Sequence, residues 1–130
     1  MSIRFTTRVD GDILRVRASG FDESLADVQG YGMAILDACR LSGATRVLCD
    51  ETALEYRLGT LDTYQAGEFL ATHVPAVAKV AIVCNPASLY DAKFFEDVVV
   101  NRGLTLRVFT DTETATRWLF GLSSSSDAGA

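Results

Sequence analysis

Residues 80–86 read Val-Ala-Ile-Val-Cys-Asn-Pro. The apolar run from Val80 to Cys84 has no polar alternation, which is typical of a central parallel strand covered on both faces. Asn85 and Pro86 then predict a helix start, because Asn is a good N-cap and Pro is tolerated at the first helical position. A buried strand followed directly by a helix indicates an α/β protein.

A second stretch of the same kind lies upstream. Residues 46–50 read Arg-Val-Leu-Cys-Asp and predict a short buried strand that ends in the acid Asp50. We expect a looser loop over residues 51–59. A helix is then predicted from Thr60, its N-cap, to a stop before Pro75.

The N-terminal region predicts a β-hairpin. Apolar residues alternate from Ile3 to Val9 and from Ile13 to Ala18. Between them, Asp10-Gly11-Asp12 supplies the positive φ that a tight turn requires. The remaining predicted elements are a helix over residues 23–42 capped by Asp22, a helix from Pro86 to Gly103, a strand over residues 104–108, and a short helix opened by the capping box Thr110-x-x-Glu113.

The predicted order is hairpin, helix, strand, helix, strand, helix, strand, helix. Short connections of this kind imply right-handed parallel crossovers. The fold class predicted is therefore α/β, with a mixed, mostly parallel sheet, an N-terminal hairpin and helices packed against it. We expect one domain over residues 3–120 and a flexible tail over residues 121–130.

Charge and composition exclude several kinds of partner. With 12 Lys and Arg against 17 Asp and Glu, the net charge of -5 repels nucleic acids and anionic membranes. The densest basic group, made up of Arg4, Arg8, Arg15 and Arg17, alternates with apolar residues and is interpreted as a solvated sheet face. No apolar run approaches a membrane span and the N-terminus has no signal core, so we expect a cytoplasmic protein.

The residue types present argue against a metal, a cofactor or catalysis. Cys39, Cys49 and Cys84 are widely spaced and lie in apolar stretches, which predicts inert buried thiols. His73 is the only histidine and is expected at the end of a helix, where it complements the dipole. Asp50 also occupies the place of a receiver-domain phosphoacceptor, but the acidic pair and the lysine that a receiver needs are missing.

The element pattern resembles the STAS-like domains, in particular the bacterial SpoIIAA-like branch that contains anti-sigma-factor antagonists. The resemblance covers about residues 3–120. It rests on the hairpin and helix, on Val47-Leu48-Cys49-Asp50 before its loop, on the strand over residues 80–84, and on residues 106–111 before a helix that carries Trp118-Leu119. It implies a signalling module that binds a protein partner.

Antagonists of that family carry an acid at the end of a strand and then an Asp-Ser-Ser-Gly-like motif whose serine is phosphorylated. Asp50 matches the strand-terminal acid, and Leu58-Gly59-Thr60 falls where the motif lies, with Thr60 nearest the phosphoacceptor. The preceding acid and the paired serines are missing. The resemblance therefore implies Thr60 as a candidate phosphoacceptor, beside its predicted role as a helix cap.

Two functions from different classes follow. The first is a non-enzymatic module that binds a protein partner through the loop over residues 51–59 and the start of the second helix, with contacts from Asp50, Glu55, Tyr56, Arg57 and Gly59. The alternative is a carrier of a small apolar ligand, as in the similar Sec14 fold, held between the sheet and the second and third helices. A homodimer is also expected, because the apolar positions Phe94-Phe95 and Val98-Val99-Val100 exceed what one helix face can bury.

Overall fold

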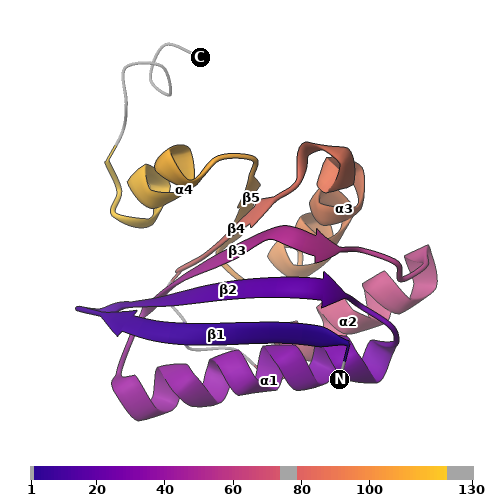
Figure 1. Cartoon of the computed structure of the whole chain (residues 1–130), viewed down its shortest axis with the longest axis horizontal. Coiled ribbons are helices and arrows are strands. Elements are labelled where there is room, and N and C mark those ends of the chain that lie inside the picture. Colours follow the sequence, from indigo (N-terminus) through magenta and orange to yellow (C-terminus); the bar gives the residue numbers. More distant parts are fainter. Residues whose placement is uncertain (1, 74–78, 123–130) are drawn as a thin grey trace.

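The computed structural model describes residues 2–73 and 79–122. Five strands form one sheet in the order β1-β2-β3-β4-β5, with β1 antiparallel to β2 and the other neighbours parallel (Figure 1). This is the mixed, mostly parallel sheet that the sequence predicts. The elements are β1 (Ile3–Asp10), β2 (Ile13–Phe21), α1 (Leu25–Ser42), β3 (Arg46–Glu55), α2 (Thr60–His73), β4 (Lys79–Cys84), a 3-10 turn (Pro86–Ser88), α3 (Leu89–Val100), β5 (Leu106–Phe109) and α4 (Thr112–Leu119).

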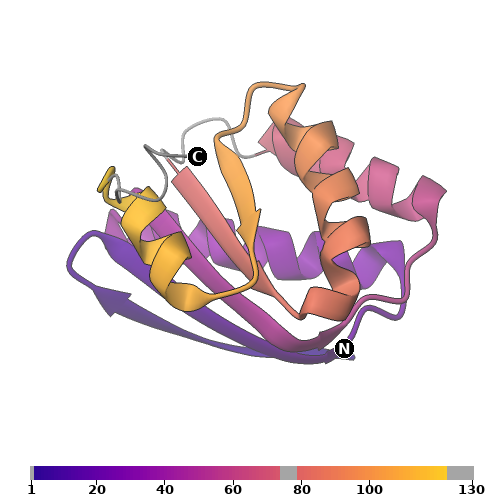
Figure 2. The same cartoon turned by 90° about the horizontal axis from the view of Figure 1, so that it is seen from above.

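The helices divide unequally between the two faces of the sheet. Helices α1, α2 and α3 lie on one face and α4 lies on the other (Figure 2). The core on the first face includes Leu14, Val47 and Val99, and the core on the second face includes Val83 and Leu119. The sheet is therefore buried on both faces at its centre, as the unbroken apolar run of β4 predicts.

The hairpin forms where the sequence predicts it. Gly11 has a φ of 65° in the two-residue turn, a value that side chains other than glycine rarely adopt. Strand β2 is longer than predicted and reaches Phe21, because its end pairs in parallel with the end of β3. The arginines of the hairpin behave as expected, since Arg4, Arg8 and Arg17 are exposed on the face opposite α1.

Strand β3 is five residues longer than the sequence predicts, which is the largest difference between the predicted and the observed elements. The strand was expected to end at Asp50, but it continues to Glu55 and pairs with β2 as far as Phe21. Glu51 and Thr52 lie opposite the single residue Ala18, which makes a β-bulge in β3. A bulge changes which side chains face inward, so both Glu51 and Leu54 are buried on the face of α1 to α3.

Three helix starts also differ from prediction. Ser24, not Asp22, caps α1, and its hydroxyl accepts a hydrogen bond from the Asp27 N–H at 3.3 Å. Asp111, not Thr110, caps α4 and accepts from the Thr114 N–H at 2.8 Å. Helix α2 begins at Thr60 itself, which moves the cap position to the preceding residue. In α1 and α4 a residue one or two positions further along the chain supplies the side-chain oxygen that the orphan N–H groups need.

The apolar residues of α3 pack within the chain more fully than expected. Val98 and Val99 are buried, Phe94 and Phe95 are half-buried, and Val100 is exposed. These residues therefore give little support for a homodimer, which stays a prediction.

The predicted tail is only partly described. Gly121 and Leu122 still donate hydrogen bonds to carbonyls of α4, and residues 123–130 lie outside the described residues. Within the described residues, no helix combines the length and the apolar character that crossing a bilayer requires.

Candidate functional site

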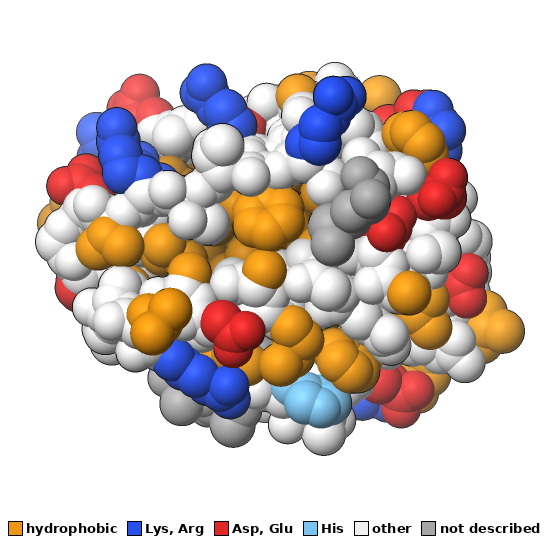
Figure 3. Space-filling model, turned by 60° about the horizontal axis from the view of Figure 1, so that its bottom comes forward, with side chains coloured by type: hydrophobic (Ala, Val, Ile, Leu, Met, Phe, Trp, Pro, Cys, Tyr) orange, Lys and Arg blue, Asp and Glu red, His pale blue; other side chains and the backbone are white. Residues whose placement is uncertain are grey.

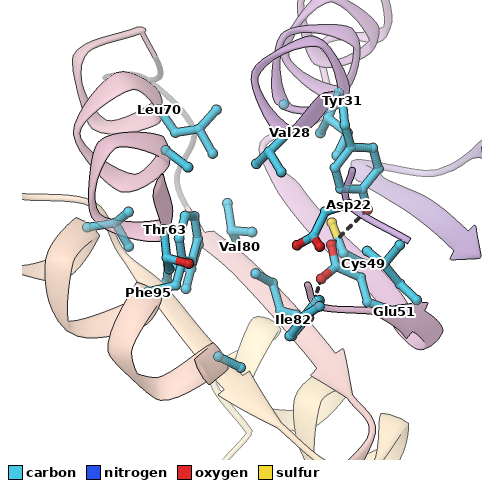
Figure 4. A pocket seen from close by; sticks show the side chains of 18 of the residues that line it. Asp22, Val28, Tyr31, Cys49, Glu51, Thr63, Leu70, Val80, Ile82 and Phe95 are labelled. Carbon is cyan, nitrogen blue, oxygen red and sulfur yellow. Dashed lines mark hydrogen bonds between the residues drawn. The ribbon is translucent and has the colours of Figure 1, made fainter. Parts of the chain in front are cut away.

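A cavity of about 150 Å³ lies between the sheet and helices α1, α2 and α3. Val28, Leu70, Val80 and Phe95 lie around one part of it, and their side chains come from α1, α2, β4 and α3 (Figure 4). Its lining also includes Thr63 in the first turn of α2 and the exposed Asp91 in the first turn of α3. The cavity therefore reaches the surface where these two helices begin, beyond the carboxyl ends of β3 and β4, a usual place for ligands in α/β proteins.

One side of this apolar cavity carries a buried carboxylate, Glu51. Its two oxygens accept hydrogen bonds from the Tyr31 hydroxyl at 2.8 Å and from the Tyr56 hydroxyl at 2.5 Å. Tyr31 comes from α1, and Tyr56 directly follows β3. Regular alternation along β3 from Val47 and Cys49 turns this carboxylate toward the cavity, and the bulge at Glu51 and Thr52 brings Leu54 to the same face.

A second buried carboxylate, Asp22, lies on the same side (Figure 4). It follows the end of β2, and one of its oxygens accepts hydrogen bonds from the backbone N–H groups of Arg57 and Leu58. Asp22 therefore fixes the loop between β3 and α2 against the cavity instead of capping α1. Both Asp22 and Leu58 line the cavity, so the loop forms part of its wall.

Burial dominates the electrostatics of this region. It raises the pKa of Glu51 although the two tyrosine hydroxyls stabilise the ionised form. It also raises the pKa of Asp22, against the effect of the two backbone hydrogen bonds. The pKa values of Tyr31 and Tyr56 rise for the same reason, and the nearby carboxylate adds to the effect. The tyrosines are therefore neutral donors at physiological pH.

The thiol of Cys49 also lines the cavity, beside the acid pair (Figure 4). Burial raises its pKa well above the ordinary value, and the charge of Glu51 acts in the same direction. Cys39 and Cys84 are buried free thiols with raised pKa values too. All three are thus mainly protonated, weak nucleophiles, as the sequence predicts.

The packing of α1 against α2 sets one boundary of the cavity. A Cβ at Gly32 of α1 would lie only 2.2 Å from a Leu70 methyl carbon of α2. Leu70 therefore occupies space that any larger residue at position 32 would take from it. The two helices approach closely there, while the space between them and the sheet stays open at Val28 and Val80.

The predicted partner surface does not form one patch. Tyr56 is half-buried and points to Glu51, so it belongs to the cavity. Glu55 and Arg57 do come together as an exposed ion pair at 2.7 Å, and the Arg57 guanidinium lies 3.8 Å from the centre of the Phe21 ring. The reason for the difference is the extension of β3, which makes neighbouring residues alternate between the two faces.

Asp50, Gly59 and Thr60 occupy separate positions. Asp50 lies on the opposite face of the sheet from Glu51, where it accepts hydrogen bonds from the Thr52 hydroxyl and N–H. The Gly59 carbonyl accepts from Thr63. Thr60 is exposed in the first turn of α2, and among the described residues no hydrogen bond to its hydroxyl is found, so its role as a cap stays a prediction.

Sequence reasoning missed the buried acids. The sequence predicts Asp22 as a helix cap and Glu51 as a loop residue. The available signal is the alternation of Val47, Cys49 and Glu51, together with Tyr31 on the apolar face of a helix. A bulge leaves no signal in a single sequence, so the burial of Leu54 on the same face as Glu51 is not predictable.

The described residues contain no group of three His, Cys, Asp or Glu side chains able to hold a metal ion. His73 ends α2 as predicted, and its ring nitrogen lies 2.8 Å from the Phe69 carbonyl oxygen. The polar groups that line the cavity are the buried carboxylates of Asp22 and Glu51, the two phenol hydroxyls and the Cys49 thiol, with Thr63 and the exposed Asp91 where the cavity reaches the surface.

No protein-family model matches the sequence, and no curated protein matches it significantly. Among solved structures, the chain is similar to an uncharacterized protein of the DUF3478 family with a SpoIIAA-like fold from Shewanella loihica PV-4. The two share 21% sequence identity with a TM-score of 0.54, over 91% of this chain and 94% of that chain. The chain therefore has the SpoIIAA-like fold that its element pattern predicts. A likeness of fold does not carry a function with it.

Proposed function

From a SpoIIAA-like fold with a hollow core, we propose that this chain is a non-enzymatic module that binds a small, mainly apolar ligand in the cavity between the sheet and helices α1 to α3. The observation that carries the proposal is the pairing of an apolar cavity of about 150 Å³ with the buried Glu51 carboxylate. Burying a carboxylate is unfavourable without a compensating interaction. A functional reason for keeping it there is recognition of a polar group on a ligand.

The size of the cavity limits the ligand. An engineered protein cavity of about 150 Å³ with apolar walls binds benzene. The corresponding ligand here is a single ring or a short chain, which is much smaller than a phospholipid. The proposal therefore keeps the carrier class of the Sec14-like alternative but assigns it a smaller ligand.

The polar side of the cavity limits the ligand further. Each oxygen of Glu51 accepts one tyrosine hydroxyl and retains the capacity for another donor. A ligand hydroxyl or amino group is the natural complement, because a hydrogen bond to a charged acceptor is stronger than one between neutral groups. We therefore assign a ligand with an apolar body and one hydrogen-bond donor.

The protonation states of the Cys49 thiol and of the two tyrosines support ligand binding rather than catalysis. The buried thiol of Cys49 has a raised pKa and so is a poor nucleophile. Both oxygens of Glu51 are held by tyrosines whose own pKa values are raised, so these phenols stay protonated and do not act as bases near pH 7. A non-enzymatic role needs only that these groups stay in place.

Native mass spectrometry of the protein purified from its native cell tests the proposal. We expect an added small mass that is lost on unfolding, and a reduced occupancy in Ala92→Leu, which fills the cavity from α3. Ala87→Leu, at an exposed position before α3, is the matched control and should keep the ligand. An empty wild-type chain that also binds no small alcohol when one is added would contradict the proposal.

A protein partner at the start of α2 is the second candidate. Leu61 is 68% exposed and Tyr64 is 37% exposed on the helix that follows the loop, beside the Glu55–Arg57 ion pair. Exposed apolar side chains with a charged rim are usual at protein interfaces. Capture of a partner by the wild type and not by Leu61→Asp supports this role. Equal capture by both proteins argues against it.

A further inference from the structure

The outward-pointing backbone groups at the two edges of the sheet differ in their hydrogen-bond partners. At the β5 edge, the outward-pointing N–H of Val108 donates to the Glu96 carboxylate of α3 at 2.6 Å, and Lys93 pairs with that carboxylate at 3.3 Å. The Glu96 side chain thus accepts a hydrogen bond that a further strand would otherwise accept from Val108. At the β1 edge, none of the described residues bonds to the outward backbone groups over the eight residues of the strand. An open edge strand is a ready template for another strand.

The register of the hairpin tells which groups of β1 point outward. The Ser2 carbonyl accepts a hydrogen bond from the Phe21 N–H at 3.3 Å, so Ser2 bonds toward β2. Because antiparallel pairs alternate, Arg4, Thr6, Arg8 and Asp10 also bond toward β2. The N–H and C=O groups at the free edge therefore belong to Ile3, Phe5, Thr7 and Val9.

Helix α1 lies beside this edge, and the Phe5 ring of β1 packs edge-on against the Tyr31 ring of α1 at 5.3 Å. The side of α1 that faces away from α2 carries small residues at its centre, flanked by Asp27 and Asp37. Gly30 and Ala34 lie about 200° around the helix from Gly32, which contacts α2. Small side chains let two helices approach closely.

Figure 3 looks onto the side of the molecule that holds α1 and β1. Hydrophobic side chains form a band across the middle of this face, and most charged side chains lie around its rim. Val9 is 50% exposed on β1 and Leu41 is 91% exposed on α1. An apolar band beside an open strand edge is a surface that a second protein strand can cover.

We propose that the free edge of β1 binds the β1 edge of a second copy of this chain, antiparallel and two-fold symmetric, with Thr7 opposite the partner's Thr7. Two registers overlap most of the strand. The register centred on Thr6 places Arg4 opposite the partner's Arg8, which is repulsive. The register centred on Thr7 places Arg4 opposite the partner's Asp10 and Phe5 opposite the partner's Val9.

The charged side chains therefore favour the register centred on Thr7. The directions of the backbone N–H and C=O groups are compatible with this register. This register sets the outward groups of Phe5, Thr7 and Val9 against those of the partner's Val9, Thr7 and Phe5, so both strands exchange hydrogen bonds. The Gly30 and Ala34 side of α1 then meets its own copy at the same two-fold axis. One isologous interface uses the open edge, the apolar band and the small residues together.

Cysteine substitution tests the register directly, since the three native cysteines are buried. Thr6 and Thr7 are adjacent and both exposed, which makes them matched positions. Under mild oxidation we expect Thr7→Cys to form a disulfide-linked dimer in high yield, and Thr6→Cys to stay largely uncrosslinked. The reverse result, or equal yields, would overturn the proposed pairing.

Sedimentation equilibrium provides the second measurement. The wild type should be a dimer at micromolar concentration. Thr7→Pro, which removes an outward N–H and leaves the β2 side of the strand intact, should be a folded monomer by circular dichroism. A monomeric wild type overturns the proposal, and so does a Thr7→Pro variant that remains dimeric. If Thr7→Pro does not fold, the cysteine pair decides.

Discussion

The two faces of the central sheet are filled to different degrees, and the difference separates stability from function. Under α4, Val83, Ala115 and Leu119 are almost completely buried in a filled core. Side chains from the sheet fix α4, because Arg46 and Lys79 donate to the carbonyls of Leu119 and Trp118 at 2.8 and 3.0 Å. Under α1 to α3, the core contains a cavity and two buried carboxylates.

The apolar packing under α4 is fully explained by its contribution to the stability of the fold. A cavity gives up dispersion contacts, and a buried acid gives up hydration, so both features weaken the face that carries them. The face of α1 to α3 thus departs from the arrangement that maximises stability, and such departures are expected at functional sites. Substitutions on the two faces should therefore have different consequences.

The largest effect is expected from Leu119→Ala on the filled face. Leu119 is 0% exposed, and its truncation leaves a cavity in a core that has little room to relax. We expect the free energy of unfolding to fall by about 2–5 kcal/mol in urea denaturation. Leu122→Ala, at a position 58% exposed just beyond α4, is the control and should change it by less than about 0.5 kcal/mol.

Enlarging an alanine on each face sharpens the comparison. Ala115 and Ala92 are both buried, the first under α4 and the second beside the cavity. Ala115→Leu should overpack the filled core and lower the free energy of unfolding by about 1–3 kcal/mol. Ala92→Leu has empty space to enter and should leave stability unchanged or raised in the same denaturant titration. Equal destabilisation by both variants would remove the distinction between the faces.

The pH dependence of stability tests the buried acid. Because the pKa of Glu51 is raised in the folded state, its contribution to stability is present below the ordinary value of 4.5 and is lost as the pH rises through the raised value. Glu51→Gln should remove this loss, so its melting temperature should fall less than that of the wild type between pH 5 and pH 8. A tenfold difference in proton affinity corresponds to about 1.4 kcal/mol.

The Glu51→Gln experiment has to account for a second buried acid and needs a control at an exposed one. Asp22 also has a raised pKa, so the variant should keep part of the slope. Glu55→Gln changes an exposed carboxyl in the same strand and should leave the wild-type slope intact. Identical slopes for Glu51→Gln and the wild type would show that the Glu51 carboxyl is not a buried charge.

The smallest effect is expected at Thr60. Since its hydroxyl has no hydrogen-bond partner among the described residues, Thr60→Ala should change the free energy of unfolding by less than about 0.5 kcal/mol. A loss of about 1 kcal/mol or more in the same denaturant titration would restore the role of helix cap. Asp111→Ala on α4, which removes a cap that is present, provides the positive comparison.

The elements of the fold were largely predictable from the sequence, because each rests on local chemistry. The unbroken apolar run of β4, the alternation in the hairpin and the Asn85-Pro86 helix start all lie where they were expected. The end of β3 was not predictable in the same way. Its continuation to Glu55 depends on pairing with Ser19 and Phe21, which are distant in sequence.

The candidate site was less predictable than the fold. The partner surface assigned to the loop assumed that Tyr56 points outward, whereas pairing of β3 turns it toward Glu51. The alternative of an apolar ligand between the sheet and the helices points to the cavity region but to neither of its buried carboxylates. Asp22, Tyr31 and Glu51 meet only through the pairing of β2 with β3 and the packing of α1, which no local pattern records.

A titration of the protein with benzyl alcohol, followed by amide chemical shifts in NMR, tests directly whether the cavity binds such a ligand. Benzyl alcohol combines an apolar ring with one hydroxyl donor, which is the proposed ligand chemistry. We expect saturable shifts at Val28, Val80 and Phe95 that disappear in Ala92→Leu and persist in Ala115→Leu. Shifts that are absent, that cluster at α4, or that survive in Ala92→Leu would contradict a binding site in this cavity.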